Sequence, residues 1–209
     1  MAIIAINDVT LTIKKKTILD HVSLNIEAGT IHGLVGENGS GKTMLMKSIC
    51  GFVHPQEGTI TVQGKNVGKD VDFPPNIGLI IETPGFIPYL SGYKNLEYLA
   101  SIRRKIGKNE ILAALEAVGL QDDRDKKVGK YSLGMRQRLG IAQAIMEDPD
   151  ILVLDEPMNA LDAQCVTLVR ELLLKLKSQG KTILITSHNT QDIDILCDHI
   201  SPMANGRMV

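Results

Sequence analysis

Two patterns of apolar residues divide the chain. The segment from about residue 3 to 35 contains short runs in which apolar and polar side chains alternate: AIIAI, VTLTI, VSLNI and IHGLVG. Turn-like KKK and EAGT segments separate these runs. Such alternation predicts β-strands. TITVQGK (59–65) and NIGLII (76–81) have the same character, so the first part of the chain is predicted to be rich in strands.

The middle of the chain has a different period. From about residue 92 to 146, apolar positions recur at intervals of three and four, which predicts helices. In the last third, the strand-like ILVLD is followed by AQCVTLVRELLLKLKSQG, a predicted helix ending at Gly180, and then by the strand-like KTILITSH. Because strands that alternate with helices form parallel sheets, we predict an α/β fold with a helical insertion.

Composition narrows the class of protein. The chain has 209 residues, 44% of them hydrophobic and 22% charged, which is typical of one soluble globular domain. Its net charge of −1 and aromatic content of 3% argue against nucleic-acid binding. Neither a signal peptide nor an apolar run of about 20 residues is present, so a cytoplasmic protein is expected. The three cysteines have no paired spacing and are predicted to be reduced, buried thiols.

Residues 36–43 read GENGSGKT and match the phosphate-binding pattern G-x-x-x-x-G-K-[ST]. A predicted strand precedes this loop and a predicted helix follows it, as the motif requires. Lys42 is expected to reach the β- and γ-phosphates of ATP and Thr43 to ligate Mg²⁺. The alternative, a glycine turn that only caps a helix, does not explain this context. The predicted nucleotide-binding residues are Gly36, Glu37, Asn38, Gly39, Ser40, Gly41, Lys42 and Thr43.

Two adjacent carboxylates end the apolar run ILVLDEP. Buried ionised carboxylates need a partner, and a metal ion carried by a nucleotide would supply one. Asp155 is therefore predicted to complete the Mg²⁺ shell, and Glu156 to polarise a water for attack on the γ-phosphate. The alternative for Glu156 is a solvated acid at a strand end.

The segment YSLGMRQRLGIAQAIMEDPDILVLDEP (131–157) resembles the signature motif and Walker B region of ATP-binding cassette (ABC) ATPases, and the resemblance covers essentially the whole chain. Ser132 and Gly134 match the signature serine and second glycine of that family. The resemblance implies that two copies associate head to tail. Each signature segment would then contact an ATP molecule on the P-loop of the other copy.

Two further segments extend this resemblance. MNALD (158–162) is similar to the family's D-loop, which implies that Asp162 lies at the dimer interface. His188 matches the switch histidine, which implies a contact with the γ-phosphate. A structural histidine at a strand end and an N-cap role for Asp162 are the alternatives.

One acidic residue departs from the usual family pattern. Glu82 stands where most members have Gln, in a context that resembles exporters of the lantibiotic-immunity and bacitracin-resistance type (IIETPGF, LSGYKNLEYLA). A carboxylate is a strong ligand for hard cations, so Glu82 is predicted to ligate Mg²⁺ together with Thr43 and Asp155. The alternative is a neutral change of one polar residue.

The chain also departs from the family pattern at the residue that contacts adenine, in the signature motif and near its last residues. Ile13 stands where the family commonly stacks an aromatic residue on adenine, which predicts an apolar and weak grip on the base. The KKK run (14–16) is predicted to form a solvated turn, or else to place one lysine near the phosphates. Leu133 and Met135 are unusual in the signature, but phosphate contact is expected to survive. Pro202 is expected to interrupt a closing hairpin.

These observations predict one ABC ATPase domain over residues 1–209. Residues 1–84 and 149–209 would form a P-loop NTPase core with an N-terminal antiparallel β subdomain, and residues 85–148 a helical subdomain. The resemblance implies an ATP-hydrolysing subunit, held at the inner face of the membrane by a separate permease, that exports a peptide antibiotic or similar amphipathic compound. Alternatives are a soluble ABC ATPase of translation or DNA repair, and a module that does not hydrolyse ATP.

The segment TPGFIPYLSGYKN (83–95) is the predicted contact with the permease. It contains Phe86, Tyr89 and Tyr93, a large share of the few aromatic residues, which suits an anchor surface. The alternative is that these rings pack beneath the helical insertion.

Overall fold

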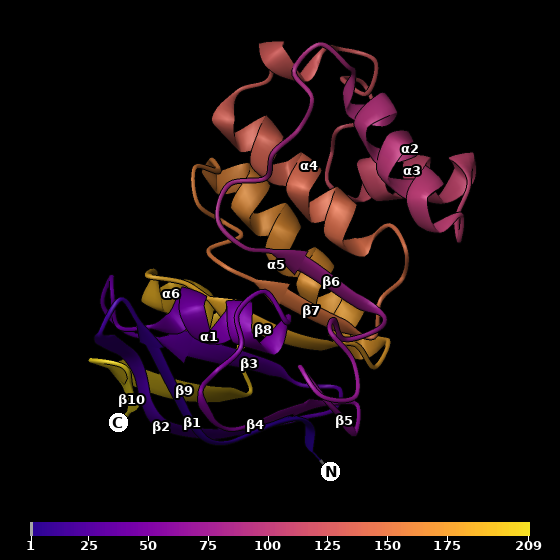
Figure 1. Ribbon diagram of the computed structural model, residues 1–209. Helices are drawn as coiled ribbons and strands as arrows, with labels where there is room; N and C mark the ends of the chain where they lie inside the picture. Colours follow the sequence, from indigo (N-terminus) through magenta and orange to yellow (C-terminus); the bar gives the residue numbers. More distant parts are fainter. Residues whose placement is uncertain (1) are drawn as a thin grey trace.

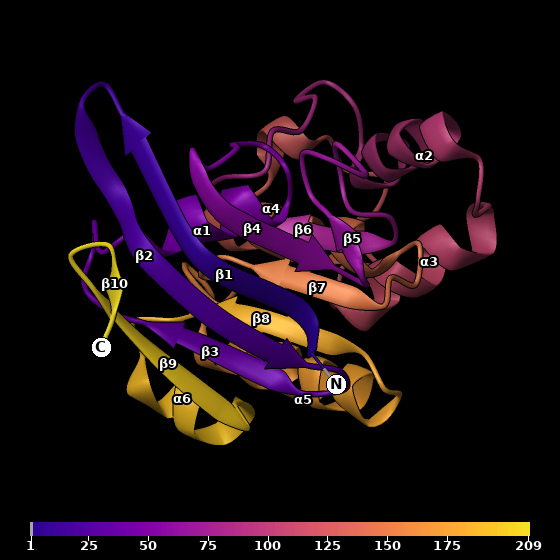
Figure 2. The ribbon, with the colours of Figure 1, turned by 60° about the horizontal axis from the view of Figure 1, so that its bottom comes forward.

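A computed structural model describes residues 2–209, which form two sheets with helices packed around them (Figures 1 and 2). The smaller sheet has four antiparallel strands in the order β2–β1–β4–β5. Its strands are β1 (Ala2–Ile13), β2 (Lys16–Glu27), β4 (Glu57–Val62) and β5 (Lys65–Asn66). Figure 2 shows the long strands β1 and β2 lying over the larger sheet.

The larger sheet has six strands in the order β10–β9–β3–β8–β7–β6. Five of them are parallel, and β10 pairs antiparallel with β9. Their bounds are β3 (Ile31–Val35), β6 (Ile77–Ile80), β7 (Ile151–Leu154), β8 (Thr182–Thr186), β9 (His199–Ala204) and β10 (Arg207–Met208). The mainly parallel sheet confirms the predicted α/β fold, and the smaller sheet supplies its antiparallel part.

Helices fall into two groups. α2 (Gly92–Arg103), α3 (Lys108–Ala117), a 3-10 turn (Val128–Lys130) and α4 (Leu133–Ile145) lie between β6 and β7 in the sequence. α5 (Ala163–Ser178) and α6 (Thr190–Leu196) connect strands of the larger sheet, whereas α1 (Lys42–Ile49) leads from β3 of the larger sheet to β4 of the smaller one. Figure 1 shows α2, α3 and α4 on the opposite side of the larger sheet from the smaller sheet. Within residues 2–209, no helix combines the length and the apolar content needed to cross a membrane.

Strand β7 shows why the sequence ILVL is continuously apolar. Ile151 and Val153 belong to a buried cluster that includes the smaller sheet and α1, whereas Leu152 and Leu154 belong to a second cluster beneath α4 and α5. Successive side chains of a strand point to opposite faces, so a strand covered on both faces must be apolar at every position. All four residues are buried.

Two elements differ from the predictions. AIIAI and VTLTI belong to a single strand, β1, whose pairing with β2 shifts register between Ile6 and Val9. Asp8 has a φ of +52° at this irregularity, as expected of a bulge. Helix α6 was not predicted, because its seven residues are too few to show a helical period. It buries Ile193 and Leu196.

Pro202 lies within β9, so the expectation that it interrupts the hairpin was wrong. The hairpin pairs only Met203 and Ala204 with β10. The carbonyl of Pro202 accepts a hydrogen bond from Val209 N at 3.0 Å. In an antiparallel strand, the N–H and C=O of one residue point to the same side. The N–H that proline lacks would therefore point to the same side as the Pro202 carbonyl, at the end of the hairpin far from its turn.

The three cysteines are free thiols. Cys50 is buried, and burial raises its pKa to about 12. Cys165 and Cys197 are only partly buried, which corrects the prediction that all three are enclosed. A raised pKa keeps a thiol protonated and weakly reactive.

Candidate active site

The glycines of the GENGSGKT loop provide backbone shapes that other residues rarely adopt. Gly36, Gly39 and Gly41 have φ values of +152°, +82° and +110°. A Cβ atom at Gly36 would lie 2.1 Å from the carbonyl oxygen of Met203, so the loop packs tightly against β9. Gly41 precedes α1 and has no side chain with which to cap the first N–H groups of this helix. Those N–H groups therefore remain as donors at the positive end of the helix.

Lys42 brings a charge into the centre of this loop. It is only 8% exposed. Its Nζ donates hydrogen bonds to the carbonyl oxygens of Gly36, at 2.6 Å, and Glu37, at 2.9 Å. An ammonium group has three donors, so a phosphate oxygen can replace one of these partners without moving the backbone.

Two hydroxyl groups hold Asp155. Thr43 Oγ1 donates to Asp155 Oδ2 at 2.8 Å, and Thr186 Oγ1 donates to Oδ1 at 2.7 Å. Helix α1 and the end of β8 thus meet at the end of β7. The hydroxyl and carboxylate oxygens form a hard donor set of the kind that Mg²⁺ prefers, so these residues fit the predicted metal.

Glu156 and His188 contact each other directly. His188 Nδ1 lies 2.8 Å from Glu156 Oε2, where a ring N–H donates to the carboxylate. Glu156 N donates to Thr186 Oγ1 at 2.9 Å. Glu156 has a φ of +51°, a backbone conformation that is uncommon for residues other than glycine. The two predicted catalytic side chains therefore form one pair that Thr186 links to Asp155.

A cavity of about 370 Å³ opens beside the loop. It is lined by Lys16, Ile18, Asn38, Gly39, Gly41, Lys42, Thr43, Met44, Asp155 and Glu156. The fold thus joins the predicted phosphate-binding loop to both acidic residues. Lys14 and Lys15 form the predicted turn. Lys16 lines the cavity, in keeping with the alternative that places one lysine of the KKK run near the phosphates. Ile13 is 37% exposed and lies outside this lining, which contains Ile18 instead.

Glu82 follows β6 with a φ of +60°. Its Oε1 accepts a hydrogen bond from Lys47 Nζ at 2.6 Å. It lines a second cavity, of about 270 Å³, together with Thr83, Leu133, Gln137, Asp155, Glu156, Asn159 and Ala160. Glu82 thus lies on the side of Asp155 away from the phosphate-binding loop, and Lys47 offsets its charge. Its carboxylate also fits a divalent cation.

The signature residues Ser132 and Gly134 lie at the start of α4. Ser132 Oγ caps this helix by accepting from Met135 N at 3.1 Å. A Cβ atom at Gly134 would lie 2.8 Å from the carbonyl oxygen of Ala160, so only glycine packs here without displacement. Neither residue lines the cavity beside Lys42.

Asp162 caps α5, as its alternative interpretation predicted. Its Oδ1 accepts from Cys165 N at 2.8 Å. This hydrogen bond from the backbone lowers the pKa of the Asp162 carboxyl. The capping role does not exclude a second role at an interface, because Asp162 is exposed on the surface.

Several residues that support the site were not predicted from the sequence. Gln137 Nε2 donates to the carbonyl oxygens of Glu156 and Pro157, both at 3.2 Å, and so ties α4 to the acidic loop. Thr186 joins Asp155 to Glu156. Thr186 could have been found from its place at the end of KTILITSH, a strand predicted to lie in the same parallel sheet as ILVLD. Parallel strands end at the same edge of a sheet, so polar residues at their ends lie close together.

The sequence of this chain is similar to those of known proteins. A family model described as ABC transporter matches residues 19–159. The ABC transporter ATP-binding protein YybJ of Bacillus subtilis is 48% identical over 98% of this chain and 94% of its own length. The bacitracin transport ATP-binding protein BcrA of Enterococcus faecalis is 42% identical over 92% of this chain, which spans only 63% of that relative. The lantibiotic transport ATP-binding protein SrtF of Streptococcus pyogenes is 37% identical over 93% and 84%.

Solved structures agree with the sequence relatives. A dimeric structure of MJ0796, a bacterial ABC transporter cassette, superimposes with a TM-score of 0.89 at 26% identity and covers 98% of this chain and 96% of that one. This likeness confirms the predicted P-loop NTPase fold. With the family model and the relatives, it shows that the chain belongs to the ABC transporter family as an ATP-binding cassette that hydrolyses ATP.

Proposed function

We propose that this chain is the ATPase subunit of an exporter of peptide antibiotics or similar amphipathic compounds. The observation that carries the ATPase part is the convergence of Thr43, Asp155, Glu156 and His188 beside the phosphate-binding loop. The export part rests on the relatives named for bacitracin and lantibiotic transport. Glu82 adds to it, since Glu at this place is the feature of the chain that resembles such exporters.

The proposed binding step uses residues of α1 and residues that follow β3, β6 and β7. Lys42 and the N–H groups of the glycine loop bind the phosphates. Thr43, Asp155 and Glu82 would hold Mg²⁺. When bound, this ion neutralises charge on the β- and γ-phosphates.

The proposed hydrolytic step uses the Glu156–His188 pair. The Glu156 carboxylate orients and polarises the attacking water. His188 fixes that carboxylate through Nδ1 and contacts the γ-phosphate. Ile13, although outside the lining of the cavity, is kept as a proposed apolar contact to the base.

A second copy of the chain completes the proposed site. Ser132 and Gly134 lie at the positive N-terminus of α4, a suitable end for an anion, but outside the cavity of their own chain. Head-to-tail pairing would bring them to the ATP of the other copy and place Asp162 at the interface. The dimeric MJ0796 cassette supports such an assembly.

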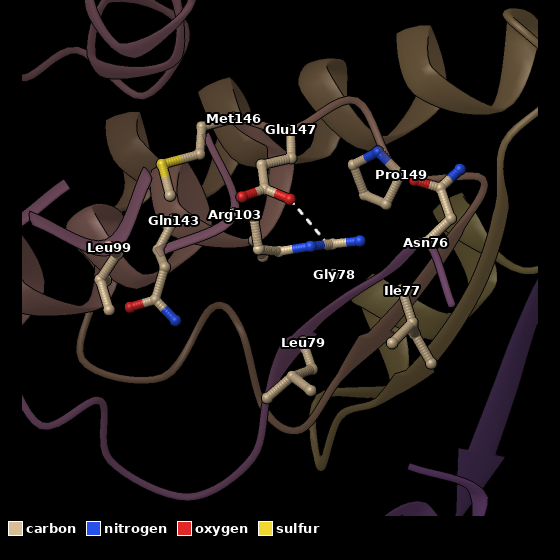
Figure 3. Close-up of a pocket in the computed structure, with 11 residues that line it drawn as sticks. Asn76, Ile77, Gly78, Leu79, Leu99, Arg103, Gln143, Met146, Glu147 and Pro149 are labelled. Carbon is tan, nitrogen blue, oxygen red and sulfur yellow. Dashed lines mark hydrogen bonds and ion pairs between the residues drawn. The ribbon is translucent and has the colours of Figure 1, made fainter. Parts of the chain in front are cut away.

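A groove between β6 and the helical insertion is the proposed surface for a membrane permease (Figure 3). It is lined by Asn76, Ile77, Gly78, Leu79, Leu99, Arg103, Gln143, Ala144, Met146, Glu147 and Pro149. Figure 3 shows Arg103 reaching toward Glu147, and their Nη1 and Oε2 atoms are 2.7 Å apart. Walls that combine apolar side chains with two amides, Asn76 and Gln143, and one ion pair suit a short amphipathic segment of a partner.

The aromatic residues of segment 83–95 divide between the two predicted roles. Phe86 and Tyr93 are partly buried and pack against the core, as the packing alternative proposed. Tyr89 is 70% exposed and remains free to anchor a partner. Binding to the permease would hold the chain at the inner face of the membrane. The relatives cited above are transport proteins, so the alternative in translation or DNA repair is set aside.

Replacing Glu156 by Gln tests the ATPase part. Gln keeps the shape of the side chain but is not a base, so steady-state turnover should fall by at least about 100-fold. Affinity for ATP should be unchanged, as measured by fluorescence with a labelled nucleotide. Glu116→Gln, an exposed change of the same kind on α3, is the control and should keep full turnover. Full turnover by Glu156→Gln would end the catalytic assignment.

Purification from the native cell tests the transporter part. The tagged chain, extracted with a mild detergent, should co-purify with a polytopic membrane protein in near-equal amount. Arg103→Glu, which places two like charges across the groove, should release that protein while ATP hydrolysis persists. A chain bound only to ribosomes or DNA would overturn the proposal.

A further inference from the structure

Asp192 is a buried carboxylate close to the Glu156–His188 pair. It is 3% exposed and lies on α6. Its Oδ1 accepts hydrogen bonds from Arg170 Nε at 2.9 Å and Nη2 at 2.5 Å. Its Oδ2 accepts one from Ser187 Oγ at 2.9 Å. Both carboxylate oxygens are therefore satisfied, as a buried charge requires.

Ser187 connects Asp192 to the loop that carries His188. Its hydroxyl donates to Asp192 and accepts from Asn189 N at 3.1 Å. The Ser187 hydroxyl oxygen thus links the two residues on either side of His188, Ser187 and Asn189. The side chain of His188 is 70% exposed, and its ring is held by the hydrogen bond to Glu156. The direction from which the ring reaches Glu156 depends on the backbone that Ser187 and Asn189 hold.

The network also borders the reacting groups. A cavity of about 240 Å³ is lined by Glu156, Met158, Asn159, Ala160, Leu161, Val166, Ser187, His188, Asn189 and Asp192. Arg170, the ion-pair partner of Asp192, belongs to α5, the helix that Asp162 caps. The ion pair therefore connects the helix behind the D-loop-like segment to the histidine loop.

We propose that Asp192, held by Arg170, is a positioning residue for ATP hydrolysis that fixes His188 through the Ser187 hydroxyl. The inference rests on the role proposed above for His188. Any buried donor would satisfy the second carboxylate oxygen of Asp192, but the donor here is the hydroxyl of the residue before the histidine, so the ion pair is joined to the histidine loop. Ser187→Ala separates the two roles, because it keeps the Arg170–Asp192 pair and removes the hydroxyl that joins this pair to the histidine loop.

Turnover of Ser187→Ala at saturating ATP should fall by about 10- to 100-fold, the range expected when a reacting group loses its alignment. Its affinity for ATP should stay close to that of the unmodified chain, and its melting temperature should fall by only a few degrees, because Asp192 Oδ2 loses a donor. In nitrogen-15 histidine NMR spectra, the protected Nδ1–H signal of His188 should be lost. That signal is assigned by its absence from His188→Gln.

Asp192→Asn and Asp194→Asn form a matched pair on α6. Asp194 is exposed, so its change should leave both turnover and the NMR signal intact. Asp192→Asn should lose turnover together with stability, since it leaves Arg170 without its charged partner. Adding Ser187→Ala to Asp192→Asn should cause little further loss if the two act in series.

The outcomes separate the inference from the function on which it rests. Unchanged turnover in His188→Gln would contradict the proposed role of the histidine. An inactive His188→Gln beside a fully active Ser187→Ala with the NMR signal intact would overturn only the positioning role. Loss of turnover in Ser187→Ala with the NMR signal preserved would overturn it too, because the hydroxyl would then act by another route.

Discussion

The side chain of Glu82 is 65% exposed, and that of its partner Lys47 is 23% exposed. Lys47 lies one helical turn after Thr43, so both point from the same face of α1 toward strand ends. Thr43 reaches Asp155 after β7, and Lys47 reaches Glu82 after β6. One helix therefore supports two of the three proposed metal ligands and supplies the cation that offsets the additional acid.

Lys47→Met should weaken binding of Mg²⁺ and ATP by about two- to five-fold, within the range of 0.2–1 kcal/mol for exposed ion pairs. The physical reason is that Glu82 then repels the phosphates without compensation. In a Glu82→Gln background the same change should cost less. Isothermal titration of all four variants measures this coupling, with exposed Lys105→Met as the control. Equal losses in both backgrounds would show that Lys47 acts independently of Glu82.

Helix α5 begins at an acidic cap, and its last turn carries Lys175 and Lys177. Acidic residues near the N-terminus and basic residues near the C-terminus both favour the helix dipole. α5 buries Val169 and Leu173 against the sheet and fixes Arg170 beside α6. The helix is therefore both a cover for the sheet and a support for the histidine loop.

The cap at Asp162 predicts a dependence on pH. Its folded pKa is lowered from 3.8 by the hydrogen bond from Cys165 N, so its stabilising effect is fully present above pH 3.8 and is lost as pH falls through the folded pKa. Asp162→Asn keeps a capping oxygen that does not titrate. The difference in melting temperature between the two proteins should therefore shrink below pH 3.8. A constant difference down to pH 2 would contradict the charged cap.

The two ends of the proposed composite site lie in different parts of the molecule. The phosphate-binding loop belongs to the core, whereas Ser132 lies on α4 of the helical insertion. A rotation of the insertion relative to the core would change the surface offered to a second copy. The groove proposed for the permease lies between the same two parts, so a partner bound there would be expected to influence pairing.

Ser132 offers a test of that pairing in which the helix cap is preserved. In a Glu156→Gln background, Mg²⁺ and ATP should convert the chain from monomer to dimer in light scattering. Ser132→Asp keeps a good N-cap but adds a negative charge that repels the partner's phosphates, so it should stay monomeric while binding ATP. Ser132→Asn caps equally well without a charge and should still dimerise. Dimers of Ser132→Asp would place the signature segment outside the interface.

Local signals in the sequence were enough to predict much of this protein. The glycine loop, the buried strand before Asp155, the helix after Lys42 and the helical middle depend on spacing within about 20 residues. The cap at Asp162 was also predicted, as an alternative role, since a cap and its helix are neighbours in the chain. Such features are local because backbone geometry and periodic burial act over one element at a time.

Only the tertiary structure decided which of these residues meet. Thr43 and Asp155 are 112 positions apart, and Lys47 and Glu82 are 35 apart. Their contacts exist because β3, β8, β7 and β6 are neighbours that end at one edge of the sheet. The same strand order brings His188 to Glu156 and leaves Ser187 beside Asp192. Strand order arises from the packing of the whole core, so no single segment of the sequence could have predicted the pairs that assemble the site.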